Sequence, residues 1–183
     1  MVLQLTEYGL SSAGRHRLEA FIRSRFLDVH GAQIEQFMPQ LVGLEDEQGV
    51  PRGALGYRGA ATEPLYLEQY LDRPIEQAIG RAGVSRQQIV EVGNLAGAGC
   101  RATLYLARRL PRLLLDRGFE WITFTATRPV RNMLQQLGAP LLDLGPAQRD
   151  CLDAEAQQQW GDYYRQAPRV MAGWLPAAPE LFR

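Results

Sequence analysis

A carboxylate that needs a partner stands inside the apolar run at residues 89–92. Glu91 is the only charged member of this run, whose other residues are Ile, Val and Val, and burying an unpaired charge there would cost much free energy. Glu91 could act as a general base or orient a substrate, with a pKa tuned for that task. It could equally lie on a solvated strand face or pair with one of the arginines. The sequence leaves both interpretations open.

The residues after this run could bind a phosphate group. Asn94 begins the stretch NLAGAG, which carries glycine at positions 97 and 99 and leads into a predicted helix. Free backbone N–H groups and the dipole at a helix N-terminus favour a phosphate or pyrophosphate, and Arg101 adds a positive charge. Glycines between a strand and a helix also occur simply as turns. Neither GxxxxGKS/T nor GxGxxG is present, which argues against a P-loop ATPase and a dinucleotide-binding Rossmann domain.

Cys100 follows this turn, where a helix N-terminus can lower the pKa of a thiol and make it a nucleophile. The two histidines, His16 and His30, both precede it and lie in or beside the first predicted helix. We therefore expect Cys100 to be a small buried residue, and the histidines to be surface or packing residues. Cys100 and Cys151 form no CxxC or Cys/His cluster, so we predict no metal site and no disulfide framework.

A polar group and an aromatic group are further candidates for a binding site. The polar group lies where a predicted strand gives way to a helix, like the mouth of a ligand cleft at the carboxyl ends of parallel strands. Strand propensity and helix capping would explain the same residues. The aromatic group could wall a pocket or dock a terminal helix on the sheet. The polar group is Thr123, Thr125, Thr127, Arg128, Arg131 and Asn132, and the aromatic group is Trp160, Tyr163 and Tyr164.

Hydrophobic periodicity places these candidates on alternating strands and helices. A helix between the strands at 88–95 and 120–127 supplies the crossover that parallel strands need, so we predict that these strands are parallel and that 141–144 completes a βαβαβ pattern. Pro111 predicts a kink in its helix, and residues 65–71 are ambiguous. The expected helices are 12–29, 74–83, 101–117, 129–137 and 153–165, and the expected strands are 40–44, 54–57, 88–95, 120–127, 141–144 and 169–175.

Length and composition limit the possible classes of protein. The chain has 183 residues, which predicts a single domain spanning 1–183, and its 46% hydrophobic and 22% charged residues are typical of a globular protein. Basic and acidic residues number 20 each, so no net charge concentrates nucleic acid or an anionic membrane. Every basic residue is arginine, which excludes lysine Schiff-base chemistry. No apolar run approaches the ~18 residues of a membrane span, and we expect a cytoplasmic, unanchored protein.

The order of elements resembles the Gcn5-related N-acetyltransferase (GNAT) fold. This is an α/β (α+β) fold with a mixed central sheet whose splayed parallel strands are flanked by helices. Three blocks resemble the thermostable hemolysin family: IVEVGNLA at 89–96, FTAT with VRN at 124–132, and WGDYY through VMAG at 160–173. The resemblance covers the chain from about Tyr66 onward. The family is similar in fold to acyl-homoserine-lactone and N-acyl-amino-acid synthases.

The resemblance implies an N-acyltransferase that moves an acyl group from acyl-CoA or acyl-ACP, as co-substrate, to an amine such as an amino acid or small metabolite. The superfamily binds the donor pyrophosphate on an Arg/Gln-x-x-Gly-x-Gly/Ala turn, and a backbone N–H near the strand end would stabilise the oxyanion. Many members use as general acid a tyrosine four residues before the glycine that ends the next helix, where this chain has Leu134. The implied donor-binding residues are Leu95, Ala96, Gly97, Gly99, Cys100 and Arg101. The implied catalytic residues are Glu91 as base, Asn94, Thr125, and Arg128 with Asn132, which would hold a carboxylate of the acceptor.

Two other functions stay open at this point. The missing tyrosine and the imperfect phosphate turn would fit a non-catalytic GNAT-like binding module. The family name points to a membrane-active hemolysin, but the first helix carries Arg15, Arg17, Arg23 and Arg25 opposite an apolar stripe, as a helix packed on a core does. As partners we expect a small amine acceptor and, if the donor is acyl-ACP rather than acyl-CoA, an acyl carrier protein, with no nucleic acid and no integral membrane association. The oligomeric state is open, a homodimer included.

Overall fold

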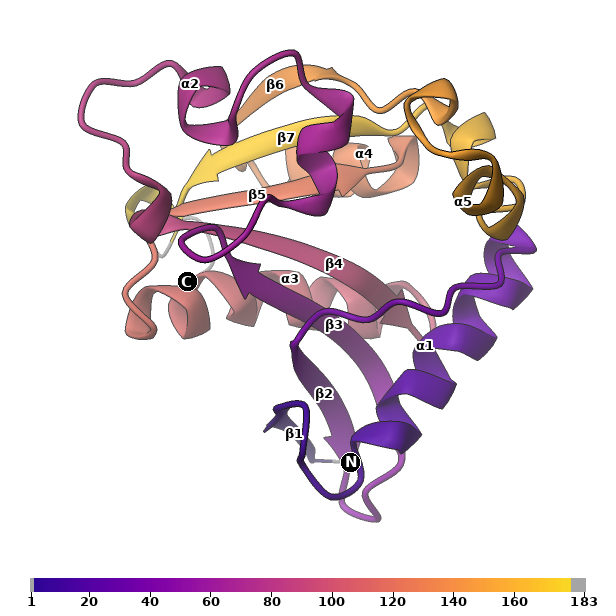
Figure 1. Ribbon diagram of the computed structural model, residues 1–183. Coiled ribbons are helices and arrows are strands. Elements are labelled where there is room, and N and C mark those ends of the chain that lie inside the picture. The colour runs from indigo at the N-terminus through magenta and orange to yellow at the C-terminus, as the bar shows by residue number, and fades with distance from the viewer. Residues whose placement is uncertain (1, 179–183) are drawn as a thin grey trace.

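The computed structural model describes residues 2–178, in which seven strands form one mixed sheet with the order β1-β2-β3-β4-β5-β7-β6 (Figure 1). Only the pairing of β4 with β5 is parallel. The strands are β1 (Leu3–Tyr8), β2 (Gln40–Asp46), β3 (Pro51–Gly59), β4 (Ile89–Gly97), β5 (Trp121–Ala126), β6 (Leu141–Pro146) and β7 (Arg169–Trp174). The helices are α1 (Arg15–His30), α2 (Ile75–Ile79), α3 (Cys100–Asp116), α4 (Arg128–Gln136) and α5 (Ala154–Gln159). Short 3₁₀ turns include η1 (Tyr66–Tyr70), η4 (Tyr163–Gln166) and η5 (Leu175–Ala177).

Helices cover both faces of the sheet, and the alternation of side chains along each strand divides the core between them. On one face, Leu106, Leu110 and Leu114 of α3 pack against apolar residues of β2, β3 and β4. On the other face, Leu18, Ile22 and Phe26 of α1 form a second cluster, and burying each of these side chains stabilises the fold by roughly 1.5–3 kcal/mol. Among residues 2–178, no helix has both the length and the apolar character needed to cross a bilayer.

The two parallel strands separate after a short paired stretch. Residues 89–92 of β4 pair with 121–124 of β5, and beyond this point β4 stays with β3 while β5 stays with β7. Asn94, with a φ of 53°, lies at an irregularity where residues 54–56 of β3 face 93–96 of β4, so that β4 carries one extra residue. The predicted GNAT-like arrangement of splayed parallel strands is confirmed, and Figure 1 shows the two strands diverging toward α1 and α5.

The C-terminal third differs from the prediction in two respects. Strand β6 does not complete a βαβαβ sheet beside β5, because β7 inserts between them and pairs antiparallel with both. The expected helix 153–165 is also wrong: α5 ends at Gln159, and η4 begins at Tyr163. Gly161 lies between them with a φ of 50°, so close to the backbone of His30 and Gly31 that a Cβ would overlap it. The chain breaks there because it docks on the end of α1, where Asp162 N–H donates to the His30 carbonyl at 2.7 Å.

The position of Arg15 on α1 differs from the expected one. It was expected on the face opposite the apolar stripe, but only 6% of it is exposed. Its guanidinium donates to the carbonyls of Met38 at 2.8 Å and Pro39 at 2.9 Å. These bonds satisfy backbone groups that a turn between α1 and β2 would otherwise bury unpaired. Arg15 therefore fixes the segment that precedes β2.

Candidate functional site

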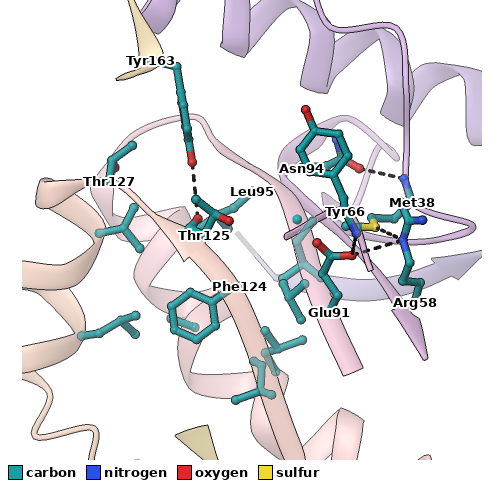
Figure 2. A pocket seen from close by; sticks show the side chains of 18 of the residues that line it. Met38, Arg58, Tyr66, Glu91, Asn94, Leu95, Phe124, Thr125, Thr127 and Tyr163 are labelled. Atoms are coloured by element: carbon teal, nitrogen blue, oxygen red, sulfur yellow. Dashed lines mark hydrogen bonds and ion pairs between the residues drawn. The ribbon is translucent and has the colours of Figure 1, made fainter. Parts of the chain in front are cut away.

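A cavity of about 490 Å³ opens where β4 and β5 separate (Figure 2). Successive strand residues point to opposite faces, so the cavity meets two different surroundings as it passes between the strands. On the α3 side it is apolar, and its wall there includes Ala107, Leu110, Pro111, Val130, Met133 and Leu134. On the opposite side it is polar and aromatic, with Tyr66, Tyr70, Glu91, Asn94, Trp160 and Tyr163.

Glu91 is buried in this wall and fully engaged. Its two carboxylate oxygens accept the N–H groups of Tyr66 and Leu67, each at 2.9 Å. Arg58 Nε lies 3.4 Å from the carboxylate, and Figure 2 shows its position beside Tyr66. Burial raises the pKa of Glu91 above its ordinary value, while the two backbone donors and Arg58 oppose that rise. The arginine pairing that the sequence left open is therefore present, and the same carboxylate lines the cavity.

Asn94 holds the neighbouring segment against the strand. Its Oδ1 accepts the N–H of Met38 at 2.8 Å, and its Nδ2 donates to the Gln36 carbonyl at 3.4 Å. Arg58 Nε also lies 3.2 Å from the sulfur of Met38. Asn94 thus positions residues 36–38 at the edge of the cavity, and the following Leu95 contributes to its lining.

The glycine turn after Leu95 has a compact structure next to the cavity. Ala96 is buried in the α1 cluster, and a Cβ on Gly97 would overlap the hydroxyl of Thr103, so the turn requires glycine there. Gly99 precedes the 17-residue helix α3. The expectation that Cys100 is buried is wrong: Cys100 and Arg101 are exposed on the first turn of α3, because its inward positions belong to Ala102 and Leu106.

Some residues of the polar group after β5 line the cavity, and others are exposed. Thr125 and Thr127 line the cavity, and the buried Thr123 donates its hydroxyl to the Val90 carbonyl at 3.0 Å. Arg128 and Asn132 are exposed on α4, whose cavity-facing residues are instead Val130, Met133 and Leu134. The structure therefore brings Thr125 together with Glu91, Asn94 and Leu95, and it does not bring Arg128 or Asn132 to them.

The aromatic group both walls the cavity and docks the C-terminal segment. Trp160 Nε1 donates to the Tyr66 hydroxyl at 3.0 Å, and the hydroxyls of Tyr70 and Tyr164 lie 2.5 Å apart. Tyr163 donates to the Thr125 carbonyl at 3.4 Å, so its hydroxyl reaches the strand end (Figure 2). Burial raises the pKa of Tyr163, which keeps the phenol protonated.

Sequence reasoning missed Tyr66, Tyr70 and Arg58 as wall residues. Tyr66 and Tyr70 belong to the ambiguous segment 65–71, where a spacing of four residues would have placed both rings on one side of a helical turn. Nothing in the sequence around Arg58 indicated a role in the cavity wall, because the segment has the pattern of an ordinary strand. Arg58 comes close to Glu91 only because β3 pairs with β4.

Comparisons with known proteins agree with this architecture. The family model of the thermostable hemolysins matches residues 9–178. A search of curated proteins finds no match. Among solved structures, FeeM, an N-acyl amino acid synthase from uncultured soil microbes, has a TM-score of 0.67 at 15% identity, over 96% of this chain and 93% of its own. The acyl-homoserine lactone synthase LasI has a TM-score of 0.65 at 15% identity, over 98% and 92%.

A third structure is BjaI, a CoA-dependent acyl-homoserine lactone synthase described with SAM and isopentyl-CoA. Its TM-score is 0.66 at 13% identity, over 99% of this chain and 88% of its own. At such identities these likenesses establish a common fold.

Proposed function

The chain belongs to the thermostable hemolysin family, and from this premise we propose that it is an N-acyltransferase that moves an acyl group from acyl-CoA or acyl-ACP to a small amine. One observation carries the proposal: the cavity between the separated strands β4 and β5 joins an apolar arm to a polar arm that contains a buried carboxylate. An acyl chain fits the first arm, and an amine acceptor fits the second. Both donors are cytoplasmic compounds, so we expect the enzyme to act there.

The donor lies along the free end of β4. Beyond Val92 no strand within residues 2–178 pairs with β4 on the β5 side, so its backbone groups near Asn94, Leu95 and Ala96 are available to the pantetheine arm and to the oxyanion. The turn with Gly97 and Gly99, followed by Cys100 and Arg101 at the start of α3, receives the phosphate groups of CoA or of a carrier protein's prosthetic arm. The thioester carbonyl then sits at the junction of the two arms.

In the reaction, the amine nitrogen forms a C–N bond with the thioester carbonyl carbon, and the C–S bond breaks. The ammonium first loses a proton to Glu91, directly or through water, and the intermediate loses a second proton as the amide forms. The thiolate takes up one proton, so that amide, free thiol and one proton leave the site. A glutamate with a raised pKa suits this exchange, because it can return to the thiolate the proton that it took from the amine.

Tyr163 contributes a hydrogen bond rather than a proton. Its raised pKa makes the phenol a poorer acid than an ordinary tyrosine, but a steady donor toward developing negative charge at the end of β5. Glu91 thus supplies the proton that a tyrosine on α4 gives in many relatives of this fold, and Tyr163 adds a hydrogen bond. Arg128 and Asn132 remain proposed acceptor contacts only if the acceptor extends beyond the cavity, since both side chains are exposed.

The proposal is tested by incubating the purified protein with short-, medium- and long-chain acyl-CoA and with acyl-ACP, each with a panel of primary amines. Thiol release and the mass of the product are measured together. We expect thiol release that depends on the amine and an amide of matching mass. Selective binding of a donor without turnover with any amine would refute the enzyme and favour a binding module.

A further inference from the structure

The polar arm of the cavity is walled by a continuous group of aromatic rings. The ring of Trp160 lies 4.9 Å from that of Tyr163 and 6.2 Å from that of Tyr66, measured between centroids. Tyr70 follows, with its ring 6.3 Å from Tyr66. The faces of aromatic rings carry partial negative charge, which attracts cations. In the part of the chain that the structure describes, the arginines that stack on aromatic rings do so on Phe37 and Tyr105, so none occupies this wall.

The charged groups around this arm are mostly acidic. Glu35, Glu91 and Asp153 are the acidic residues among those that line it, and Arg58 is the arginine. One oxygen of Asp153 caps α5 by accepting the Ala156 N–H at 2.8 Å. The Arg58 guanidinium is already shared between Glu91 and Glu63, each at 3.4 Å. His30, which also lines the cavity, adds no cation at neutral pH because burial lowers its pKa. A ligand carboxylate in this arm would therefore meet like charge.

Tyr66 fixes the distance between the two parts of the arm. Its backbone N–H donates to Glu91, and its hydroxyl accepts the Trp160 N–H. The aromatic wall around Trp160 thus stands about one tyrosine side chain away from the carboxylate. The exposed Glu35 and Asp153 lie at the rim of the cavity. A ligand that reaches from the rings to Glu91 must carry one polar end at each place, joined by a short apolar chain.

Building on the proposed acyl transfer, we propose that the acceptor is an aliphatic diamine without a carboxylate. One ammonium rests on the rings of Trp160 and Tyr66, toward the acidic rim, and stays charged throughout the reaction. The other amine reaches Glu91, gives up its proton and attacks the thioester. The product is a mono-N-acylated diamine with a cationic end and an apolar end. An enzyme that removes the carboxyl group of a diamino acid is the class of reaction that would supply this acceptor.

The experiment compares acceptors in matched triads with one acyl-CoA donor: putrescine, ornithine and butylamine, then cadaverine, lysine and pentylamine. The diamine of each triad should have a kcat/KM about tenfold or more above both the amino acid, which adds a carboxylate, and the monoamine, which lacks the second cation. Equal activity with monoamines would overturn the cationic contact. Preference for the amino acids would overturn the proposal as a whole and assign their carboxylate to Arg58.

Variants at Trp160 separate a cation contact from simple packing. Trp160→Phe keeps a ring and loses the bond to Tyr66, whereas Trp160→Leu loses the ring; we expect the preference for putrescine over butylamine to survive in the first and to disappear in the second. Tyr105→Leu removes a partly buried ring of α3 that packs on the core but does not line the cavity, and it serves as the control. Equal preference in Trp160→Leu and the control would overturn the aromatic contact.

Binding measurements separate a failure of the proposed acyl transfer from a failure of the proposed acceptor site. Thermal shifts are recorded with each amine alone, without donor. If no acceptor is acylated but putrescine still stabilises the protein more than ornithine and butylamine, the acyl-transfer proposal fails and the acceptor-site proposal stands. If acylation proceeds but putrescine has no advantage in rate or binding, the acceptor-site proposal fails and the acyl-transfer proposal stands.

Discussion

Replacement of Glu91 by glutamine gives the sharpest test of the proposed chemistry. The carboxylate offers one oxygen to each of two buried backbone N–H groups, at 2.9 Å from Tyr66 N and 2.9 Å from Leu67 N. Glutamine has one acceptor oxygen, so one of these groups loses its partner, which costs about 1–3 kcal/mol. The loss of a buried charge offsets part of this cost. A domain of this size should lose roughly 2–4 °C in Tm for each kcal/mol and remain folded.

The effect on activity should be far larger than the effect on stability. Removal of a general base lowers kcat/KM by about 10²–10⁴. In the parent protein, kcat/KM should fall as the pH drops through the raised pKa of Glu91, which lies above the ordinary value of 4.5, and Glu91→Gln should lack this acidic limb. The native carboxyl holds its proton to higher pH than the unfolded chain does, so its contribution to stability falls as the pH rises from 4.5 through the raised pKa.

Glu68 offers a matched control for this variant. Its carboxylate accepts the N–H groups of Leu65 at 2.7 Å and Ile75 at 2.8 Å and pairs with Arg86 at 2.6 Å, but it does not line the cavity. Glu68→Gln should therefore lose stability comparably, keep most of its kcat/KM and retain an acidic limb in its pH profile, shifted to lower pH because the charge of Glu68 helps to raise the pKa of Glu91. Unchanged turnover in a folded Glu91→Gln, or an equal loss in both variants, would refute the assignment of Glu91 as the base.

Three further variants address the donor arm, the hydrogen-bond donor and the fold. Leu110→Phe narrows the apolar arm, and because each buried CH₂ contributes about 0.8 kcal/mol, exclusion of two methylenes should shift kcat/KM about tenfold toward shorter acyl-CoA in a chain-length series. Tyr163→Phe removes one donor and should lower kcat by about 10²–10³ with little change in Tm; an unchanged kcat would exclude this role. Arg15→Met leaves the carbonyls of Met38 and Pro39 without their donor and should destabilise the protein by about 3 kcal/mol in urea unfolding, whereas an unchanged midpoint would contradict the anchoring role.

The centre of the fold was predictable because its signals are local. The strand at 88–95, the glycine turn and the helix at 101–117 follow one another along the chain, and β5 comes next with the parallel pairing that a helical crossover requires. Glu91, Asn94 and Thr125, which line the cavity, were candidates for the same reason, since each interrupts or ends a strand of this unit, whereas Leu95 was implied by the resemblance. Their common cavity follows from the separation of β4 and β5, which the resemblance to the GNAT fold implied.

Long-range packing accounts for what was missed. Nothing within residues 141–146 or 169–174 indicates that β7 enters between β5 and β6, because either strand has an apolar pattern that fits beside β5. Arg15 was expected at the surface because it is charged, and its burial depends on carbonyls more than twenty residues away. Arg128 and Asn132 were expected at the cleft because they follow the end of β5, but the rotation of α4 turns Val130, Met133 and Leu134 inward instead.

Leucine stands at position 134, where many members of this fold have a tyrosine, and this fits a cavity with one apolar arm and one polar arm. A tyrosine there would place a phenol in the apolar arm that we assign to an acyl chain, where an unpaired hydroxyl is costly to bury. An apolar residue keeps that arm uniformly suited to hydrocarbon. Proton transfer must then occur on the opposite side of the sheet, where the pleat of β4 already presents Glu91 and where Tyr163 reaches the end of β5. Under the proposed function, the absence of the usual tyrosine is thus a consequence of a donor arm built for longer acyl chains, and it predicts that acetyl-CoA is a poor donor.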